Sequence, residues 1–201
     1  MLKKVEIIDI VANEQPKFVE SITVKYQREG EAVRSWEMVK RHASVHAMVY
    51  NKTTDEFLLV KQYRIPVLLN DYDEELAEPG VVYEACAGLI DSDSEIDVIV
   101  QNEILEELGY AIELDQIIPV KFLKSSVGLS GADALCFYVE VTEDQRVSAG
   151  GGLPGEDIEV VRIPYDELFE FIYDPETTTD AVTMFLAMHG YSMSKLEVLK
   201  K

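Results

Sequence analysis

Apolar and polar positions alternate along this chain with two different periods, and the shorter period predicts strands. Residues 44–50 (SVHAMVY) and 56–65 (EFLLVKQYRI) are rich in β-branched and aromatic residues and are separated by the polar turn NKTTD. Two such runs around a short turn predict a β-hairpin. Comparable apolar runs predict further strands at 81–87, 117–123, 134–141 and 158–164.

Helical spacing marks three other segments. Between about residue 95 and residue 108 there is no Gly or Pro, and apolar residues recur at intervals of three and four, which predicts a helix. Ser94 precedes this segment as an expected N-cap, and Gly109 follows it where a C-terminal glycine is common. The segments 166–174 and 180–191 predict two more helices, amphipathic and apolar respectively.

The first 41 residues predict a small antiparallel β lead. A turn through Gly30 lies among β-branched runs at 5–11, 18–27 and 33–40. This segment offers little material for a core of its own, so we expect it to pack on the domain formed by residues 42–201 or on a second subunit. Trp36, the sole tryptophan, has two open interpretations, packing against this small sheet or stacking on a nucleobase.

Three segments predict irregular structure. Residues 67–79 form an acidic loop, and the loop 125–133 (SSVGLSGAD) is expected near the end of the sheet. The third, residues 143–157, contains three consecutive glycines followed by a Pro-Gly pair, which excludes regular structure. This segment is either a linker or a loop that brings Glu156 to a functional site.

Composition and charge exclude several classes of partner. The 201 residues are 47% hydrophobic and carry a net charge of −20, which indicates one acidic domain with a real core. Nucleic acids and anionic membranes bind basic surfaces, so neither is expected as a partner. No apolar signal region or membrane-spanning run is present, and we expect a soluble, cytoplasmic protein. Cys86 and Cys136 lie in apolar runs, which favours buried, reduced thiols over a disulfide.

The predicted helix 95–108 carries three glutamates near its end. At about 100° per residue, Glu103 and Glu107 fall within the apolar arc of this helix, with Glu106 beside them. A solvated acidic face would lie opposite that arc. We therefore favour an inward-facing site over a solvated surface. Repelling carboxylates that face inward need a compensating cation, and their hard oxygens suit Mg²⁺ or Mn²⁺.

Polar residues at the end of the second strand are candidates for anion binding. Gln62 and Arg64 are two positions apart and share a face of the strand. They either reach water as an ordinary strand end or, as we favour, place the Arg64 guanidinium on a phosphate. The three histidines are His42, His46 and His189, and none has the spacing of a metal ligand.

The order of strand, glycine, acidic loop and helix resembles the Nudix box, G-x5-E-x7-R-E-U-x-E-E-x-G-U, where U is a bulky apolar residue. Laid on the chain from Gly88, the pattern is matched in register up to Tyr110, although Ser94 replaces its first Glu and Asn102 replaces its Arg. Segments such as SWEMVKRHASV, LLVKQYR, EACAGLID, VGLSG and AGGGLPGEDIEV are similar to the branch of nucleoside-diphosphate-sugar pyrophosphatases. Together these segments cover about residues 35–165.

This resemblance implies a fold and a set of site residues. The expected fold is of the α+β class, a Nudix α/β/α sandwich with a mixed sheet, preceded by the small β lead. Catalysis is expected from Glu107 and Glu156. The implied metal ligands are the Ala87 carbonyl, Glu103, Glu106, Glu107 and Glu156. The implied substrate-binding residues are Trp36, Gln62, Arg64, Gly88 and Leu89.

The resemblance also implies a reaction. We expect Mg²⁺-dependent hydrolysis of a nucleoside diphosphate sugar to a nucleoside monophosphate and a sugar phosphate, with a UDP-sugar such as UDP-glucose favoured. The alternatives are an ADP-ribose pyrophosphatase and a non-catalytic nucleotide-sugar binder, the latter because of Ser94 and Asn102. In relatives the N-terminal strands exchange between two subunits and help to shape the nucleoside pocket. A homodimer of this kind is therefore expected here, with Trp36 as a stacking residue.

Overall fold

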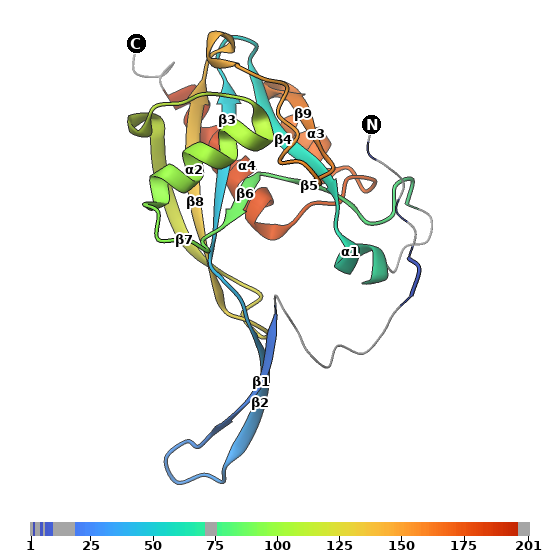
Figure 1. Ribbon diagram of the computed structural model, residues 1–201, viewed down its shortest axis with the longest axis vertical. Helices are drawn as coiled ribbons and strands as arrows, with labels where there is room; N and C mark the ends of the chain where they lie inside the picture. The colour runs from blue at the N-terminus through green and yellow to red at the C-terminus, as the bar shows by residue number, and fades with distance from the viewer. Residues whose placement is uncertain (1, 3–4, 6, 10–18, 71–75, 197–201) are drawn as a thin grey trace.

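A computed structural model describes residues 2, 5, 7–9, 19–70 and 76–196, and its body is a mixed seven-stranded sheet between helices (Figure 1). The strands of this sheet are β3 (Ser44–Asn51), β4 (Glu56–Tyr63), β5 (Val81–Glu84), β6 (Cys86–Leu89), β7 (Ile117–Ser125), β8 (Ala132–Val141) and β9 (Ile158–Pro164). β3 is central, because it runs parallel to β8 and antiparallel to β4 and β6.

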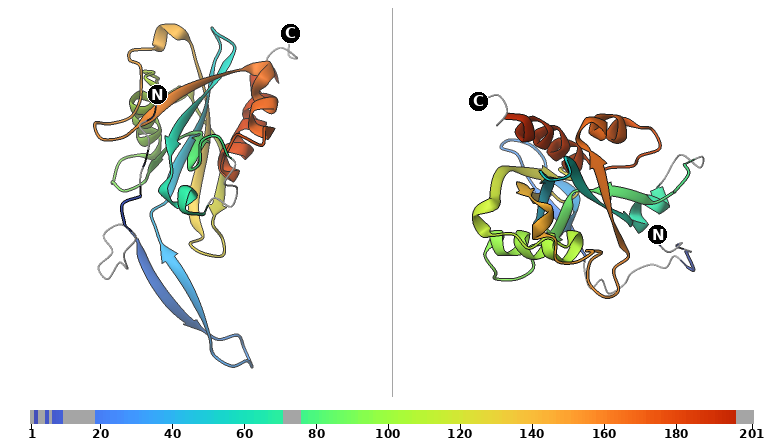
Figure 2. Two further views of the ribbon diagram at one scale, coloured as in Figure 1. Left: turned by 90° about the vertical axis from the view of Figure 1, so that its right-hand side faces the viewer. Right: turned by 90° about the horizontal axis from the view of Figure 1, so that it is seen from above.

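Helices cover both faces of the sheet (Figure 2). On one face lies α2 (Ile96–Glu103), which continues as a π-helical turn, η1 (Ile104–Leu108). On the other lie α3 (Leu168–Tyr173) and α4 (Ala181–Leu196). Each face has its own apolar core cluster. The predicted α/β/α sandwich with a mixed sheet is confirmed. Short 3-10 turns complete the structure at η2 (Leu114–Gln116), η3 (Glu143–Gln145) and η4 (Tyr165–Glu167).

The sheet opens between β3 and β4. The two strands pair only where Val49–Asn51 faces Glu56–Leu58, and beyond this point they take different partners. β5 continues the ladder of β4, β6 continues that of β3, and the chain crosses from one to the other at Ala85. This explains why the single strand predicted at 81–87 is two strands, since one strand cannot pair with both diverging neighbours.

The N-terminal strands form an arm. β1 (Glu20–Tyr26) and β2 (Arg34–Lys40) pair antiparallel and extend away from the body (Figure 1). The arm is fastened to the β7–β8 loop by the Val39 N–H, which donates to the Leu129 carbonyl at 2.9 Å. The small antiparallel sheet is thus confirmed for these two strands. Of the predicted run 5–11, the described residues are not in a strand and the others lie outside the described residues.

Local details differ from the sequence predictions at helix ends. Helix α1 (Ile65–Asn70) occupies the end of the predicted second strand and the start of the predicted acidic loop, of which residues 71–75 lie outside the described residues. The N-cap of α2 is Glu95, not Ser94, and no side chain caps that end. Cys86 and Cys136 are buried and free, as predicted. Over the described ranges, no helix combines the length and apolarity needed to cross a membrane.

Candidate active site

The helix that carries the glutamates ends in an unusual turn. η1 has π-helical hydrogen bonding, and Gly109 closes it with a φ of +81°, a left-handed conformation that favours glycine. π-helical turns within α-helices are rare and often occur at functional sites. The Gly-rich segment docks on this end, because the Gly151 N–H donates to the Glu107 carbonyl at 2.8 Å and the Gly152 N–H donates to the Glu106 carbonyl at 3.0 Å.

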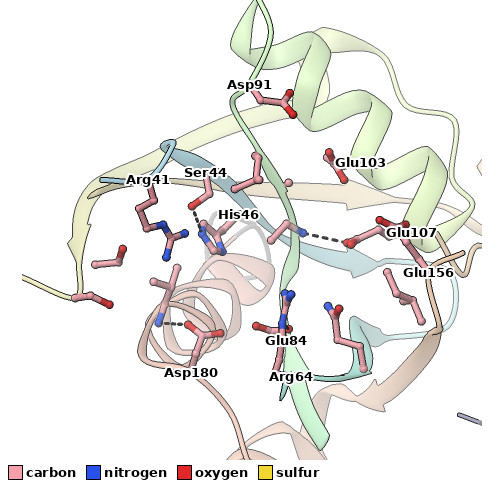
Figure 3. Close-up of a pocket in the computed structure, with 18 residues that line it drawn as sticks. Arg41, Ser44, His46, Arg64, Glu84, Asp91, Glu103, Glu107, Glu156 and Asp180 are labelled. Atoms are coloured by element: carbon pink, nitrogen blue, oxygen red, sulfur yellow. Dashed lines mark hydrogen bonds and ion pairs between the residues drawn. The ribbon is translucent and has the colours of Figure 1, made fainter. Parts of the chain in front are cut away.

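A cavity of about 710 Å³ opens where β3 and β4 diverge (Figure 3). Its acidic side is formed by Glu103 and Glu107 from the helix and by Glu156 from the Gly-rich segment. Asp91 lies at the edge of the same cavity. The structure therefore brings together carboxylates from distant parts of the chain. The side chain of Glu106, also predicted to bind metal, does not line this cavity.

Glu107 is held in place by the backbone of β6. Its side chain is buried, with the residue 5% exposed, and its Oε2 accepts a hydrogen bond from the Ala87 N–H at 3.0 Å. The pKa of Glu107 is raised to about 7, mainly by burial and also by the neighbouring Glu103 and Glu156, while hydrogen bonds from Cys86 and Ala87 act to lower it. Burial of a carboxylate disfavours its charged form, which accounts for the direction.

Glu103 packs directly over Gly88. A Cβ atom added at Gly88 would lie 1.9 Å from Glu103 Oε1, so any side chain there would displace the carboxylate. The pKa of Glu103 is raised to about 7, first by burial and then by the carboxylates of Glu106, Glu156 and Asp91. The glycine of this strand is therefore needed for close approach of the helix.

Glu156 lies in the Gly-rich segment, which is irregular as predicted. Gly150, Gly151, Gly152 and Gly155 all have positive φ. The Glu156 carboxylate is exposed, and its Oε2 accepts a hydrogen bond from the Leu153 N–H at 2.7 Å. This hydrogen bond within the same loop holds the carboxylate at the edge of the cavity. The segment thus places a carboxylate in the same cavity as Glu103 and Glu107, and the role of Glu156 in catalysis stays a prediction.

Arg64 and Gln62 line the cavity below the carboxylates, as Figure 3 shows for Arg64. The Arg64 Nε–H donates to Glu84 Oε2 at 2.8 Å. Burial raises the pKa of Glu84, although Arg64 acts in the opposite direction. Gly88 and Leu89 also line the cavity. Trp36 does not line it and lies on β2 of the arm. Four of the five predicted substrate-binding residues are thus gathered at one site.

Comparison with known proteins decides the family. Over 178 residues the chain is 35% identical to a uridine diphosphate glucose pyrophosphatase from Bos taurus, with 77% of this chain and 80% of the relative covered. It is 30% identical over 177 residues to a GDP-mannose pyrophosphatase from Enterobacter sp. (strain 638), with 86% and 87% covered. This chain belongs to the Nudix family of sugar-nucleotide pyrophosphatases.

The fold agrees with this assignment. The crystal structure of an ADP compounds hydrolase superimposes with a TM-score of 0.68 over 99% of this chain and 97% of that chain, at 15% identity. No family model matches the chain. The resemblance of residues 88–110 to the Nudix box is therefore supported by whole-chain relatives, and the predicted class of enzyme, a Nudix pyrophosphohydrolase, is confirmed.

The carboxylates of this Nudix site have the chemistry of divalent-metal ligands. Within the described ranges, no three His, Cys, Asp or Glu side chains converge closely enough to enclose a metal ion. Mg²⁺, however, usually keeps several waters and binds through one or two carboxylates together with substrate phosphates. Glu103 and Glu107 suit this role, because burial and the neighbouring carboxylates raise the pKa of each, and a bound cation would offset the cost of their charges. The donor set therefore fits Mg²⁺, with Glu156 nearby.

The two departures from the Nudix box lie at the surface. Ser94 and Asn102 are both exposed. For Glu103, burial and the neighbouring carboxylates all act to raise the pKa, so its negative charge is left for a cation to compensate.

The other side of the cavity was not predicted from the sequence. The residues there that were not predicted as ligands include Arg41, Ser44, His46, Glu84, Ser125, Ser126 and Asp180. Ser44 and His46 carried a usable signal, since both are polar positions at the start of an otherwise apolar strand. The remaining residues come from separate loops and elements, and only the fold brings them together.

Proposed function

We propose that this protein hydrolyses the diphosphate of a nucleoside diphosphate sugar in a Mg²⁺-dependent reaction, with a UDP-sugar such as UDP-glucose as the favoured substrate. The observation that carries the proposal is one cavity with Glu103, Glu107 and Glu156 on one side and Arg64 beside them. The pyrophosphatase from Bos taurus, whose name specifies uridine diphosphate glucose, supports the choice of substrate.

The roles of the residues follow from their positions. Glu103 and Glu107 would hold the metal with the Ala87 carbonyl, and Glu106 stands next to them in the helix. When bound, a divalent ion polarises phosphate oxygens and lowers the pKa of a coordinated water. Arg64 has a side chain that is 44% exposed, so its guanidinium can hold a diphosphate oxygen while remaining near Glu84.

Glu156 is the candidate general base. Its exposed carboxylate can accept a proton from a water at the cavity edge, which is within the reach of a loop residue. A new P–O bond forms at one phosphorus, the bridging P–O bond breaks, and the products are a nucleoside monophosphate and a sugar phosphate.

Particular observations support three alternatives. Hydrolysis of ADP-ribose is favoured by the structural similarity to an ADP compounds hydrolase, and hydrolysis of GDP-mannose by the relative from Enterobacter. A non-catalytic nucleotide-sugar binder is the alternative raised by Ser94 and Asn102, which replace the Glu and Arg of the Nudix box.

A substrate panel separates these alternatives. UDP-glucose, GDP-mannose and ADP-ribose would be incubated with the protein and Mg²⁺ or Mn²⁺, and the released monoesters measured as phosphate after phosphatase treatment. We expect the fastest release from UDP-glucose. The matched control is the double variant Glu103→Gln/Glu107→Gln, and release no greater than in this variant across the panel would identify a binder.

We also propose that residues 1–41 act in a homodimer in which the arm of one protomer helps to shape the nucleoside pocket of the other. Trp36 and Val24 on the arm are 52% and 37% exposed. Among the described residues, no Phe, Tyr or Trp lines the cavity. An aromatic surface for a nucleobase would therefore have to come from elsewhere, and Trp36 of a second copy would supply it.

A further inference from the structure

The face of β3 that points toward α4 changes character along its length. Met48 and Tyr50 belong to the apolar core on that face. Ser44 and His46 occupy the same face, because residues two apart in a strand point the same way. On the adjacent strand, His46 is paired with Cys136, which is buried and apolar in its packing. A serine and a histidine thus interrupt an apolar face at the point where it meets the cavity.

The two side chains form a hydrogen bond with each other, but this bond does not use all of their hydrogen-bonding atoms. Ser44 Oγ and His46 Nε2 form a hydrogen bond of 2.9 Å. Among the described residues, this is the only hydrogen bond that the His46 ring makes, which leaves Nδ1 open to a ligand. Burial lowers the pKa of His46, which favours the neutral ring. A neutral imidazole leaves Nδ1 as either a donor or an acceptor, according to which atom donates in the bond to Ser44.

This pair lies on the opposite side of the cavity from the carboxylates. Figure 3 shows Ser44 and His46 beside Arg41, with Glu107 and Glu156 across the cavity. Asp180 also faces this side, but its carboxylate caps α4, accepting from the Val182 and Thr183 N–H groups at 2.7 and 3.1 Å and from the Thr183 hydroxyl at 2.6 Å. The local surface is therefore polar, rich in hydroxyl groups and nearly neutral overall.

We propose that Ser44 and His46 form the subsite that recognises the hydroxyl groups of the sugar. This inference rests on the proposed function and adds the orientation of the substrate, with the sugar at the His46 end. A sugar hydroxyl both donates and accepts, so it can pair with Nδ1 in either tautomer of the ring. Arg41 and the serines at the end of β7 supply further polar partners around the same ring.

The nucleoside fits this end less well. Nucleobases are commonly held by stacking on aromatic side chains, and none lines this cavity within the described residues. A diphosphate lying between Arg64 and the carboxylates has two ends. The end near Ser44 and His46 offers hydrogen bonds to a polyol.

Product binding tests the orientation without requiring turnover. Calorimetry would measure the affinities of three sugar phosphates (glucose 1-phosphate, mannose 1-phosphate and ribose 5-phosphate) and of UMP, GMP and AMP for the full chain. In His46→Leu we expect about a tenfold loss of affinity for the sugar phosphate that binds best. The milder change Ser44→Ala should weaken the same affinity about threefold. Affinity for the nucleoside monophosphate should stay within twofold.

The control is His189→Leu, the same change on α4 outside the cavity, where the ring stacks on Phe185. It should leave all affinities unchanged. The proposal is overturned if His46→Leu weakens the nucleoside monophosphate and spares the sugar phosphate, if it changes neither, or if no sugar phosphate binds the wild type. A different outcome separates the two proposals. If the wild type hydrolyses no substrate of the panel, but His46→Leu still selectively loses sugar-phosphate binding, the proposed catalysis is rejected and the subsite is kept.

Discussion

At the scale of single residues, the site is built from carboxylates whose charges are costly in the absence of metal. Glu107 has a pKa raised to about 7, mainly by burial, while an unperturbed glutamate has a pKa near about 4.3. Because the folded-state pKa is the higher one, the folded protein gains protons relative to the unfolded chain between these values. The metal-free fold therefore loses stability as the pH rises from about 4 to about 7.

Glu107→Gln should remove this penalty and the activity together. We expect the metal-free variant to be more stable than wild type at pH 8 by about 1–3 kcal/mol, with the difference vanishing near pH 4. Turnover should fall by about two orders of magnitude or more. Urea unfolding with chelator and a steady-state assay would measure the two effects. Glu95→Gln, an exposed glutamate beside the same helix, is the control, and near-normal turnover in Glu107→Gln would place the catalytic site elsewhere.

A second polar cluster has the opposite pH dependence. Glu143 accepts hydrogen bonds from Asn51, Tyr110 and Arg162. The Tyr110 hydrogen bond is the main cause that lowers the pKa of Glu143 to about 2. A carboxyl whose pKa falls on folding stabilises the fold above its unfolded pKa, and this stabilisation is lost as the pH falls through about 2.

Glu143→Gln should therefore destabilise the protein at pH 7 by about 1 kcal/mol. We expect an effect of this modest size because the Glu143 side chain is 36% exposed and solvent screens its charge. Denaturant unfolding at several pH values should show the difference shrinking between about pH 4.5 and about pH 2. A difference that is constant over this range would show that the charge of Glu143 is not its cause.

At the scale of elements, the Gly-rich segment and η1 form one unit. Gly150 has a φ of +71°, and a Cβ atom there would lie 2.3 Å from the Glu107 carbonyl oxygen. The hydrogen bonds from Gly151 and Gly152 fasten the loop that bears Glu156 to the helix that bears Glu107. The position of one carboxylate relative to the other therefore depends on this close approach of two backbones.

Gly150→Ala should separate these two elements. We expect kcat to fall at least tenfold, because an Ångström-scale displacement of a catalytic group is costly. Gly30→Ala is the matched control, since Gly30 has a similar φ of +77° and no atom within 4 Å of an added Cβ. A kcat in Gly150→Ala equal to that in Gly30→Ala would show that the close approach at Gly150 does not position Glu156.

The spacing of apolar residues predicted the strands and helices but not their arrangement in space. The strands at 44–50 and 134–141 and the helix at 95–108 agree with the structure because local spacing and core packing favour the same elements. The crossing at Ala85 depends on two strands diverging in space, and no local pattern encodes it. Ser44 and His46 carried a local signal as polar positions in an apolar strand, but distant segments complete the cavity that these two residues line.

At the scale of the whole molecule, the arm is the feature with no core of its own. The proposed dimer predicts a light-scattering mass of about 45 kDa, twice the 22.7 kDa of one chain. A variant that lacks residues 1–41 should have the mass of a monomer and a higher KM for the nucleotide sugar, since Trp36 would be absent. A full-length mass near that of one chain would reject the dimer.

The net charge of −20 bears on the central claim. A diphosphate is repelled by an acidic protein and by carboxylates at its site unless a cation intervenes. The most direct test is the hydrolysis of UDP-glucose in excess EDTA, followed by addition of excess Mg²⁺. We predict that release of glucose 1-phosphate falls to the level of the Glu103→Gln/Glu107→Gln variant in EDTA and returns with Mg²⁺. Hydrolysis that continues undiminished in EDTA would contradict the account.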